Sequence, residues 1–231
     1  MLTQPALSEP LVHYYRWHSL VYDWTRWAFL FGRPEMVNLL SGHVRPKRIL
    51  EVGCGTGTNL VRLARTFPDA EIVGLDLSAD MLNLARKKTA AYTPRVSFRH
   101  GAYCEPVNAG EPFDLILFSY CLTMINPGFA QVLAVSRQDL HPTGTVAIVD
   151  FHDTPFAWFR RWMGMNHVRM ERQILADLQV SGMHLPHLAI RPAYGGWWQW
   201  MICLATITTL DYQSNQSHTA KTPPPFLDKL V

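Results

Sequence analysis

The sequence predicts an α/β fold in which a seven-stranded, mostly parallel sheet carries helices on both of its faces. Short apolar segments alternate with helical segments through residues 48–150, and this is the pattern of parallel strands joined by crossover helices. Two more apolar segments, 185–190 and 198–208, are suited to an antiparallel pair that closes the sheet. With 231 residues, the chain is long enough to bury a core of this size.

The strands and helices of the central region follow one another with short links. We expect strands at residues 48–52, 72–77, 96–99, 113–119 and 145–150. We expect helices at residues 58–66, 79–91 and 129–140, the last one ended by Pro142, Thr143 and Gly144. Ser78 can cap the second helix, because its hydroxyl can accept a hydrogen bond from an unpaired backbone N–H group. The strand 113–119 (FDLILFS) is apolar almost throughout, as in strands that are covered on both faces.

Further segments flank this core. Residues 11–31 carry aromatic residues at helical spacing, and Pro34 fits the first turn of a helix at residues 35–40. Residues 155–180 are expected to form helices that carry arginines, and the tail from residue 214 is polar. We therefore divide the chain into an N-terminal helical segment (1–45), a core (46–210) and a flexible tail (211–231).

Composition excludes several classes of protein. The formal net charge of +3 is too small to indicate a nucleic-acid partner. The four cysteines form no CxxC pair, so neither a metal site nor a redox motif is predicted. The sequence has no signal peptide and no apolar run of about 18 residues, the length that a membrane span requires. We therefore expect a cytoplasmic protein.

A glycine-rich loop is the central chemical feature of the sequence. Gly53, Gly55 and Gly57 follow the first strand and precede a helix, so a ligand can approach the backbone closely there. The spacing is GxGxG, whereas the fingerprint of a pyrophosphate-binding loop is GxGxxG. Glu51, two residues before Gly53, suits an ammonium group better than a pyrophosphate.

A second acid lies at the end of the next strand. Asp76 follows Gly57 by 19 residues, and a carboxylate in this position can accept hydrogen bonds from both hydroxyls of a ribose. Glu51 can bind an amine and Asp76 can bind a ribose, but the motif lacks the spacing that binds a phosphate. These residues therefore fit S-adenosylmethionine better than a dinucleotide. Another nucleotide bound to a Rossmann-like domain is the alternative.

This motif set resembles the class I S-adenosylmethionine-dependent methyltransferases, which have a Rossmann-like fold. The resemblance rests on E-x-G-x-G-x-G, Asp76, the segment 78–82 and the strand 113–119. It implies a cofactor site formed by Tyr15, Tyr22, Arg26, Glu51, Gly53, Cys54, Gly55, Gly57, Asn59, Asp76, Leu77, Met81, Gly101, Ala102, Tyr103, Ser119 and Tyr120. Members usually have Gly-Asp-Ala where this chain has Gly101-Ala102-Tyr103, so the carboxylate for the adenine amine is missing. A backbone acceptor or Tyr103 is expected to replace it.

Longer segments are similar to the methyltransferases of betaine-lipid synthesis, which trimethylate the amine of diacylglyceryl-homoserine. The similarity covers residues 15–33, 119–125, 149–151 and 194–198. It implies an N-terminal helical lid and a lipid amine as the acceptor. His152-Asp153 replaces an expected Gly-Asp at the end of a strand, where ligands bind in such sheets, so the substrate can differ too.

Three residues are the candidate catalytic groups. Tyr22 is expected to close over the methionine end of the cofactor, or to be a helix packing residue. Tyr120 follows the fourth strand and is expected where acceptor and sulfonium meet. His152, like His18, is a candidate base, since histidine titrates near neutrality, although a lone histidine is more often structural. Arg26 and Arg33 can clamp an anionic group or can be solvated helix charges.

The eight tryptophans also allow two interpretations. They can be large core residues, or they can line an apolar pocket or a rim that faces a membrane. Four arginines flank Trp158 and Trp162, and they either form a basic aromatic surface for anionic lipid or a solvated helix face: Arg160, Arg161, Arg169 and Arg172. The first interpretation predicts a peripheral contact with the inner face of the membrane.

Three hypotheses of function follow. The chain methylates a primary amine such as the diacylglyceryl-homoserine head group, or it methylates a small soluble metabolite, or it binds S-adenosylmethionine without catalysis. Methyl transfer from a sulfonium is an in-line displacement that needs alignment of the reactants and exclusion of water. A catalytic side chain is therefore not required for an amine that is already deprotonated.

Overall fold

The computed structural model describes residues 29–125 and 128–207, and the structural statements below refer to them. The helices are α2 (Arg33–His43), α3 (Thr58–Thr66), α4 (Ala79–Lys88), α5 (Phe129–Asp139), α6 (Ala157–Met165) and α7 (Gln173–Val180). The strands are β1 (Arg48–Val52), β2 (Glu71–Asp76), β3 (Val96–His100), β4 (Phe113–Ser119), β5 (Leu140–Asp153), β6 (His184–Ala193) and β7 (Trp198–Thr206). Three short 3-10 helices are η1 (Ala90–Tyr92), η2 (Leu122–Met124) and η3 (Tyr194–Gly196).

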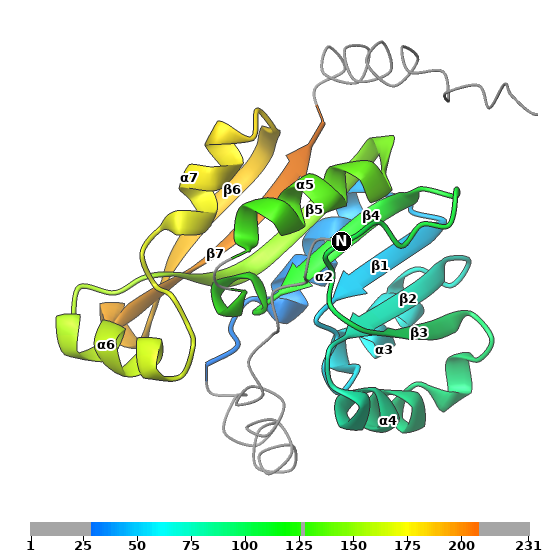
Figure 1. The fold of residues 1–231 in the computed structure, drawn as a ribbon, viewed down its shortest axis with the longest axis horizontal. Coiled ribbons are helices and arrows are strands. Elements are labelled where there is room, and N and C mark those ends of the chain that lie inside the picture. The colour runs from blue at the N-terminus through cyan, green and yellow to red at the C-terminus, as the bar shows by residue number, and fades with distance from the viewer. Residues whose placement is uncertain (1–28, 126–127, 208–231) are drawn as a thin grey trace, which may run out of the picture.

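The strands form one seven-stranded sheet in the order β3-β2-β1-β4-β5-β7-β6 (Figure 1). All neighbouring strands are parallel except those that pair with β7, which is antiparallel to β5 and to β6. The predicted fold class and the closing antiparallel pair are therefore confirmed. The chain order reverses between β1 and β4, and in sheets of this kind ligands bind beyond the carboxyl ends of the strands at such a point.

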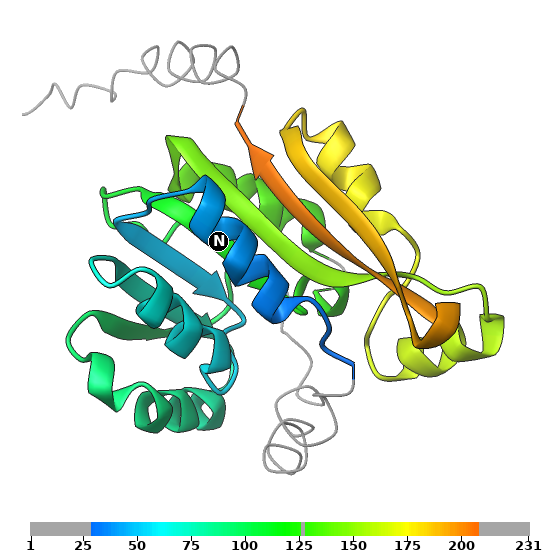
Figure 2. The same ribbon diagram turned by 180° about the vertical axis from the view of Figure 1, so that it is seen from behind.

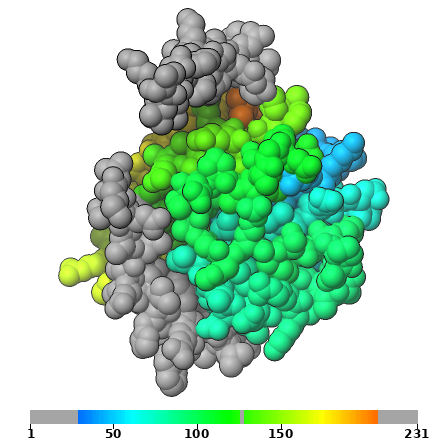
Figure 3. Space-filling view, turned by 45° about the vertical axis from the view of Figure 1, so that its right-hand side comes forward, coloured from blue at the N-terminus to red at the C-terminus, as the bar shows by residue number. Residues whose placement is uncertain are grey.

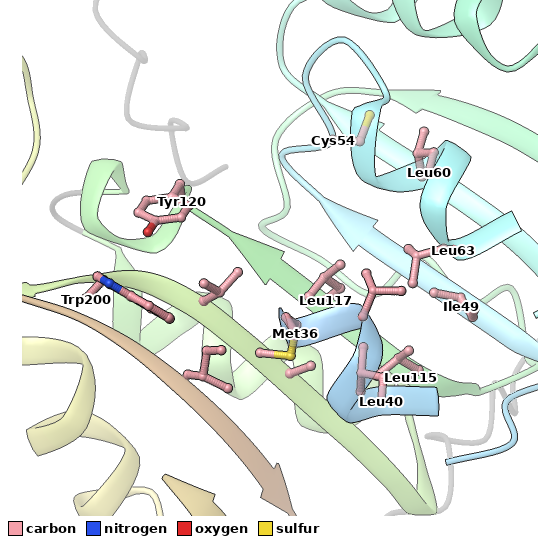
Figure 4. Close-up of a cluster of buried hydrophobic side chains, with 14 of the residues drawn as sticks. Met36, Leu40, Ile49, Cys54, Leu60, Leu63, Leu115, Leu117, Tyr120 and Trp200 are labelled. Atoms are coloured by element: carbon pink, nitrogen blue, oxygen red, sulfur yellow. The ribbon is translucent and has the colours of Figure 1, made fainter. Parts of the chain in front are cut away.

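Helices cover both faces of the sheet (Figures 1 and 2). Alternate residues of β4 explain this arrangement: Leu115 and Leu117 pack with α2 and α3, whereas Ile116 and Phe118 pack with α5 and α7. Figure 4 shows the first cluster, with Met36 and Leu40 of α2 beside residues of β4. In space-filling view the segments that include α4 and α5 form a continuous surface on one side (Figure 3).

The bounds of several elements differ from the predicted ones. Strand β5 begins at Leu140, so Pro142 lies inside a strand. Proline has no N–H group to donate to the neighbouring strand, and the pairing of β4 with this end of β5 shifts register between Phe113 and Leu115, which accommodates it. Helix α4 ends at Lys88 and is followed by η1, instead of continuing to residue 91. Helix α2 extends to His43, and residues 29–32, the described end of the predicted helix 11–31, are not helical.

Other predictions lie outside the described residues. These are the helix over 11–28 with its role as a lid, and the flexible tail over 211–231. Within the described ranges, no helix combines the length and the apolarity that a membrane span needs.

Candidate active site

The glycine loop connects β1 to α3 in a left-handed backbone conformation. Its glycines have φ values of 69° (Gly53), 53° (Gly55) and 78° (Gly57), which side chains rarely adopt. A Cβ atom at Gly53 would lie 2.7 Å from the Cβ atom of Cys121, whereas a Cβ atom at Gly55 would meet nothing within 4 Å. Gly53 is therefore required by packing, and Gly55 faces open space where a ligand can approach the backbone.

Glu51 is a buried acid directly before this loop. Its side chain is 1% exposed, and Nδ2 of Asn59 donates a hydrogen bond to Oε1 at 2.9 Å. Burial raises the pKa of Glu51 to about 7, against the Asn59 hydrogen bond and the Arg33 charge, which lower it. Oε2 is buried without a hydrogen-bond partner in the part of the chain that the structure describes. An ammonium group would supply both the missing donor and a compensating charge, so Glu51 fits the amino group of S-adenosylmethionine.

Asp76, at the end of β2, braces the glycine loop. Its Oδ2 accepts a hydrogen bond from the Gly55 N–H at 2.7 Å, and its Oδ1 accepts one from the Ser78 N–H at 2.9 Å. Ser78 caps α4 as predicted, since its hydroxyl accepts from the Met81 N–H at 3.3 Å. Leu77 is 36% exposed beside this carboxylate, whereas Met81 is buried in the first turn of α4. A carboxylate has about four acceptor sites, so backbone hydrogen bonds to it do not by themselves exclude hydrogen bonds from ribose hydroxyls.

The end of β4 is tied to the segment that enters α2. Nε of Arg33 donates to the Ser119 hydroxyl at 3.1 Å, and the guanidinium lies 5.8 Å from the centre of the Tyr120 ring. Tyr120 has a φ of 55°, and its hydroxyl donates to the Phe31 carbonyl at 2.8 Å. Positive φ is a strained conformation for a bulky residue and occurs often at functional sites. Arg33 is thus an anchored, half-buried group, and its interpretation as a solvated helix charge is wrong.

Tyr103 does not take the place of the missing adenine carboxylate. It is 5% exposed, and its hydroxyl donates to Oδ2 of Asp139 at 2.8 Å. Burial and the Asp139 charge raise the pKa of Tyr103 well above its ordinary value, so the hydroxyl keeps its proton. A buried phenol whose hydroxyl donates to a carboxylate is a packing residue. A backbone acceptor near Gly101 and Ala102 is therefore the expected partner of the adenine amine.

Lys88 is a contact that the sequence analysis missed. Its Nζ atom donates to the hydroxyls of Thr56 and Thr58, each at 2.9 Å, and so fastens the glycine loop to the end of α4. The lysine is 30 residues from Thr58 in the chain. No local motif signals such a contact.

Two acids organise the carboxyl end of β5. Asp150 is fully buried and accepts from the Leu122 N–H at 2.9 Å and from the Thr123 hydroxyl at 2.6 Å, which holds η2 in place. Asp153 forms ion pairs with Arg160 at 2.9 Å and with Arg172 at 2.6 Å. Two of the four predicted surface arginines therefore fasten α6 and the start of α7 to this strand, and a fully solvated arginine face is not what the structure contains.

Of the candidate catalytic residues, Tyr120 and His152 lie in the part of the chain that the structure describes. Tyr22, together with Tyr15, His18 and Arg26, lies outside the described residues. The Tyr120 ring packs edge to face on Phe151, with 4.8 Å between ring centres. His152, the next residue of β5, lines a small cavity together with Phe151, Arg172 and Gln173.

A second cavity, of about 550 Å³, is lined by aromatic residues alone. They are Phe29, Trp158, Phe159, Trp162, Tyr194, Trp197 and Trp198. Trp198 lies 5.1 Å from Phe151 between ring centres, so the rings of Tyr120, Phe151 and Trp198 form a continuous row from the end of β4 to the cavity. Trp198 is fully buried as a core residue, whereas Trp158 lines the cavity and is 60% exposed.

Residues 49–144 match the family described as a methyltransferase domain. Over these residues the chain is similar to methyltransferase domains, and its fold is one that solved methyltransferase structures share. Trans-aconitate 2-methyltransferase of Deinococcus radiodurans is 34% identical over 101 residues, which are 44% of this chain and 36% of that protein. A malonyl-[acyl-carrier protein] O-methyltransferase of Priestia megaterium is 32% identical over 53% of this chain and 44% of that protein. The chain thus matches less than half the length of these curated relatives.

Solved structures share the fold over most of their length. The N-methyltransferase NodS from Bradyrhizobium japonicum WM9 aligns with a TM-score of 0.63 at 16% identity, covering 76% of this chain and 94% of that one. A 1,6-didemethyltoxoflavin-N1-methyltransferase from Burkholderia thailandensis, solved with its namesake compound and S-adenosylhomocysteine, aligns with a TM-score of 0.62 at 17% identity. This alignment covers 90% of this chain and 93% of that one.

Proposed function

We propose that this chain transfers methyl groups from S-adenosylmethionine to a primary amine on an amphiphilic acceptor, such as a diacylglyceryl-homoserine head group. The aromatic cavity carries this proposal. Its volume of about 550 Å³ is within the range of ligand pockets, and its seven aromatic residues suit the apolar body of an acceptor. The row of rings from Trp198 to Tyr120 connects this cavity to the end of β4, where the polar part of the acceptor would lie.

The residues present fit the cofactor. We assign Glu51 to its amino group, Gly53, Cys54, Gly55 and Gly57 to its methionine part, Asp76 to the ribose, and Leu77 and Met81 to the adenine. When bound, S-adenosylmethionine supplies an electrophilic methyl group on its sulfonium. Asn59 holds Glu51, Arg33 holds Ser119, and Tyr120 holds the segment that enters α2, so these residues position the site. The roles of Tyr15, Tyr22 and Arg26 remain predictions outside the described residues.

We also propose that the α6 end of the molecule contacts the inner face of a membrane. Phe156, Trp158 and Trp162 are 38%, 60% and 44% exposed, and Trp197 of the adjoining turn is 51% exposed. The segment 154–170 contains three arginines and no acidic residue. Tryptophan and arginine together favour the interface of an anionic bilayer. An amine carried by a lipid would then reach the site without leaving the membrane.

The test is methyl transfer to diacylglyceryl-homoserine in anionic liposomes, compared with transfer to free homoserine. We expect the lipid acceptor to be preferred, and Trp158→Ala combined with Trp197→Ala to lower its kcat/KM by about tenfold or more, because each truncation removes an aromatic wall. Leu188→Ala is the matched control, since Leu188 is an exposed apolar residue on β6 that does not line the cavity.

The same aromatic lining favours a second candidate, a small soluble acceptor with a planar ring, because rings stack on aromatic side chains. Methylation of soluble planar amines without any liposome dependence would support this candidate and reject the lipid one. Cofactor binding with no transfer to either class of acceptor would indicate the third hypothesis, a non-catalytic binding protein.

A further inference from the structure

A small cavity at the carboxyl end of β5 is separate from the aromatic one. It has a volume of about 30 Å³ and lies between η2, the start of α5, the end of β5 and the segment 169–174. About 10–15 Å³ on this measure holds one water, so the space suits two waters or one carboxylate group. The cavity includes Thr123, which is three residues after Tyr120, so it lies beside the proposed acceptor position.

His152 is the buried polar group in the wall of this cavity. The register of β5 against β7 shifts between Phe151 and Asp153, which makes His152 the extra residue of a β-bulge. Bulges occur often beside active sites, where they turn a side chain in a new direction. His152 is 5% exposed, and its Nδ1 atom is buried without a hydrogen-bond partner among residues 29–125 and 128–207.

Burial and the nearby charge of Arg172 lower the pKa of His152, so its imidazole is neutral. A neutral imidazole presents one N–H donor and one acceptor. A buried ring nitrogen without a partner is costly unless a ligand or a water completes it.

The carboxylates near the cavity already have hydrogen-bond partners. Asp153 already accepts from Arg160 and Arg172, and Asp150 already accepts from η2. The Nε atom of Arg172 donates a hydrogen bond to Asp153. Within the described residues, its two terminal nitrogen atoms donate no hydrogen bond. Arg169 lines the cavity as well, while its backbone N–H donates to the Thr123 carbonyl at 2.9 Å. Two arginines, Arg169 and Arg172, therefore line the cavity together with the buried imidazole of His152.

We infer that this cavity is a carboxylate-binding subsite, in which His152, Arg169 and Arg172 take a carboxylate that the methyl acceptor carries besides its amine. The inference rests on the proposed function for the identity of the acceptor, but the subsite itself is a property of these three residues. Guanidinium groups match the planar shape of a carboxylate. The small volume of the cavity favours a carboxylate over a bulkier anion.

The subsite is tested directly by binding, without methyl transfer. The full chain, saturated with S-adenosylhomocysteine and labelled with ¹⁵N in its histidine rings, is titrated with acetate and with acetamide, its neutral isostere. We expect acetate to shift the His152 ring signals saturably and acetamide to leave them unchanged. The His152→Gln variant identifies those signals by their loss.

Variants of the arginines complete the test. Arg169→Gln and Arg172→Gln are expected to weaken acetate binding by about tenfold each, on the scale of a lost charge-assisted hydrogen bond. Arg161→Gln is the matched control, because Arg161 is an exposed arginine of α6 that does not line the cavity. Arg169→Gln also leaves the Asp153 ion pairs in place, so it reports on the subsite even if Arg172→Gln disturbs folding.

Three results would overturn the inference: a response to acetamide equal to that to acetate, no saturable response to acetate, or an acetate affinity that both arginine variants keep at the wild-type value. Lipid methylation by a chain that does not bind acetate would reject the subsite and leave the proposed function standing. Acetate binding by a chain that does not methylate lipid amines would reject the proposed acceptor and leave the subsite standing.

Discussion

The two halves of the sheet are built from different chemistry. The half that contains β1, β2 and β4 positions its site through backbone geometry, with left-handed glycines and two acids that accept hydrogen bonds. The half that contains β5, β6 and β7 presents aromatic rings and arginine pairs. The methyltransferase-domain match ends at residue 144, so most of β5 and all that follows it lie outside the match. The similarity to methyltransferase domains therefore lies mainly in the first half, and we expect acceptor specificity in the second.

The largest expected effect tests the first half. Asp76→Ala removes the acceptor of the Gly55 N–H and the proposed partner of the ribose, so the affinity for S-adenosylhomocysteine should fall by about a hundredfold, the scale of two lost hydrogen bonds to a charged group. Titration calorimetry measures this change. Asp114→Ala is the matched control, because Asp114 also accepts from two backbone N–H groups, those of Lys47 and Arg48, at the opposite end of the sheet. Equal losses in the two variants would mean that Asp76 acts through folding alone.

The second prediction concerns pH and Glu51. Its folded pKa of about 7 is above its ordinary value, so the folded state binds more protons than the unfolded state between about pH 4.5 and 7. Glu51 therefore makes the chain less stable as pH rises through this window, by roughly 3 kcal/mol in total. Glu51→Gln should remove this dependence, which denaturant unfolding at a series of pH values measures.

Cofactor affinity should change with pH in the opposite direction. An ammonium group favours the ionised carboxylate, so binding of S-adenosylhomocysteine should strengthen as pH rises through about 7, and Glu51→Gln should abolish the increase. An unchanged pH profile in this variant would contradict the assignment of Glu51 to the amino group.

A smaller effect is expected in the second half, at Asp153. Its pKa is below the ordinary value because hydrogen bonds from Arg172 and Arg160 outweigh the burial that raises it. Asp153→Asn should loosen α6, which carries three residues of the aromatic cavity. The kcat/KM for an amphiphilic acceptor should then fall about fivefold, which corresponds to roughly 1 kcal/mol of lost transition-state stabilisation. Cofactor affinity should stay within about twofold. Glu35→Gln is the control, since it breaks an exposed ion pair with Arg191. A change in cofactor affinity instead would show that the two halves are coupled.

How well the sequence predicts each half follows from how local its contacts are. Glu51 and the glycines were predictable because they form one short motif, and Ser78 was predictable because Met81, its capping partner, lies three residues away. The strand 113–119 was predictable because both of its faces are apolar. The aromatic cavity was not, because Phe29, α6 and the turn before β7 meet only in the folded chain. The contacts of Lys88 with the glycine loop, and of Arg160 and Arg172 with Asp153, were not predictable either. In the sequence these residues look like solvated surface charges.

The smallest effect concerns Tyr103, where a local pattern suggested a role that a distant partner rules out. Tyr103→Phe removes one donor from Asp139, which still accepts from the Val107 and Asn108 N–H groups. We expect a loss of about 1 kcal/mol in the free energy of unfolding, the usual contribution of one hydrogen bond, and no change in affinity for S-adenosylhomocysteine. Denaturant unfolding and calorimetry on the same variant measure the two quantities. A weaker affinity with unchanged stability would return Tyr103 to the adenine site, and would mean that the half of the sheet that binds the cofactor extends further than its backbone contacts indicate.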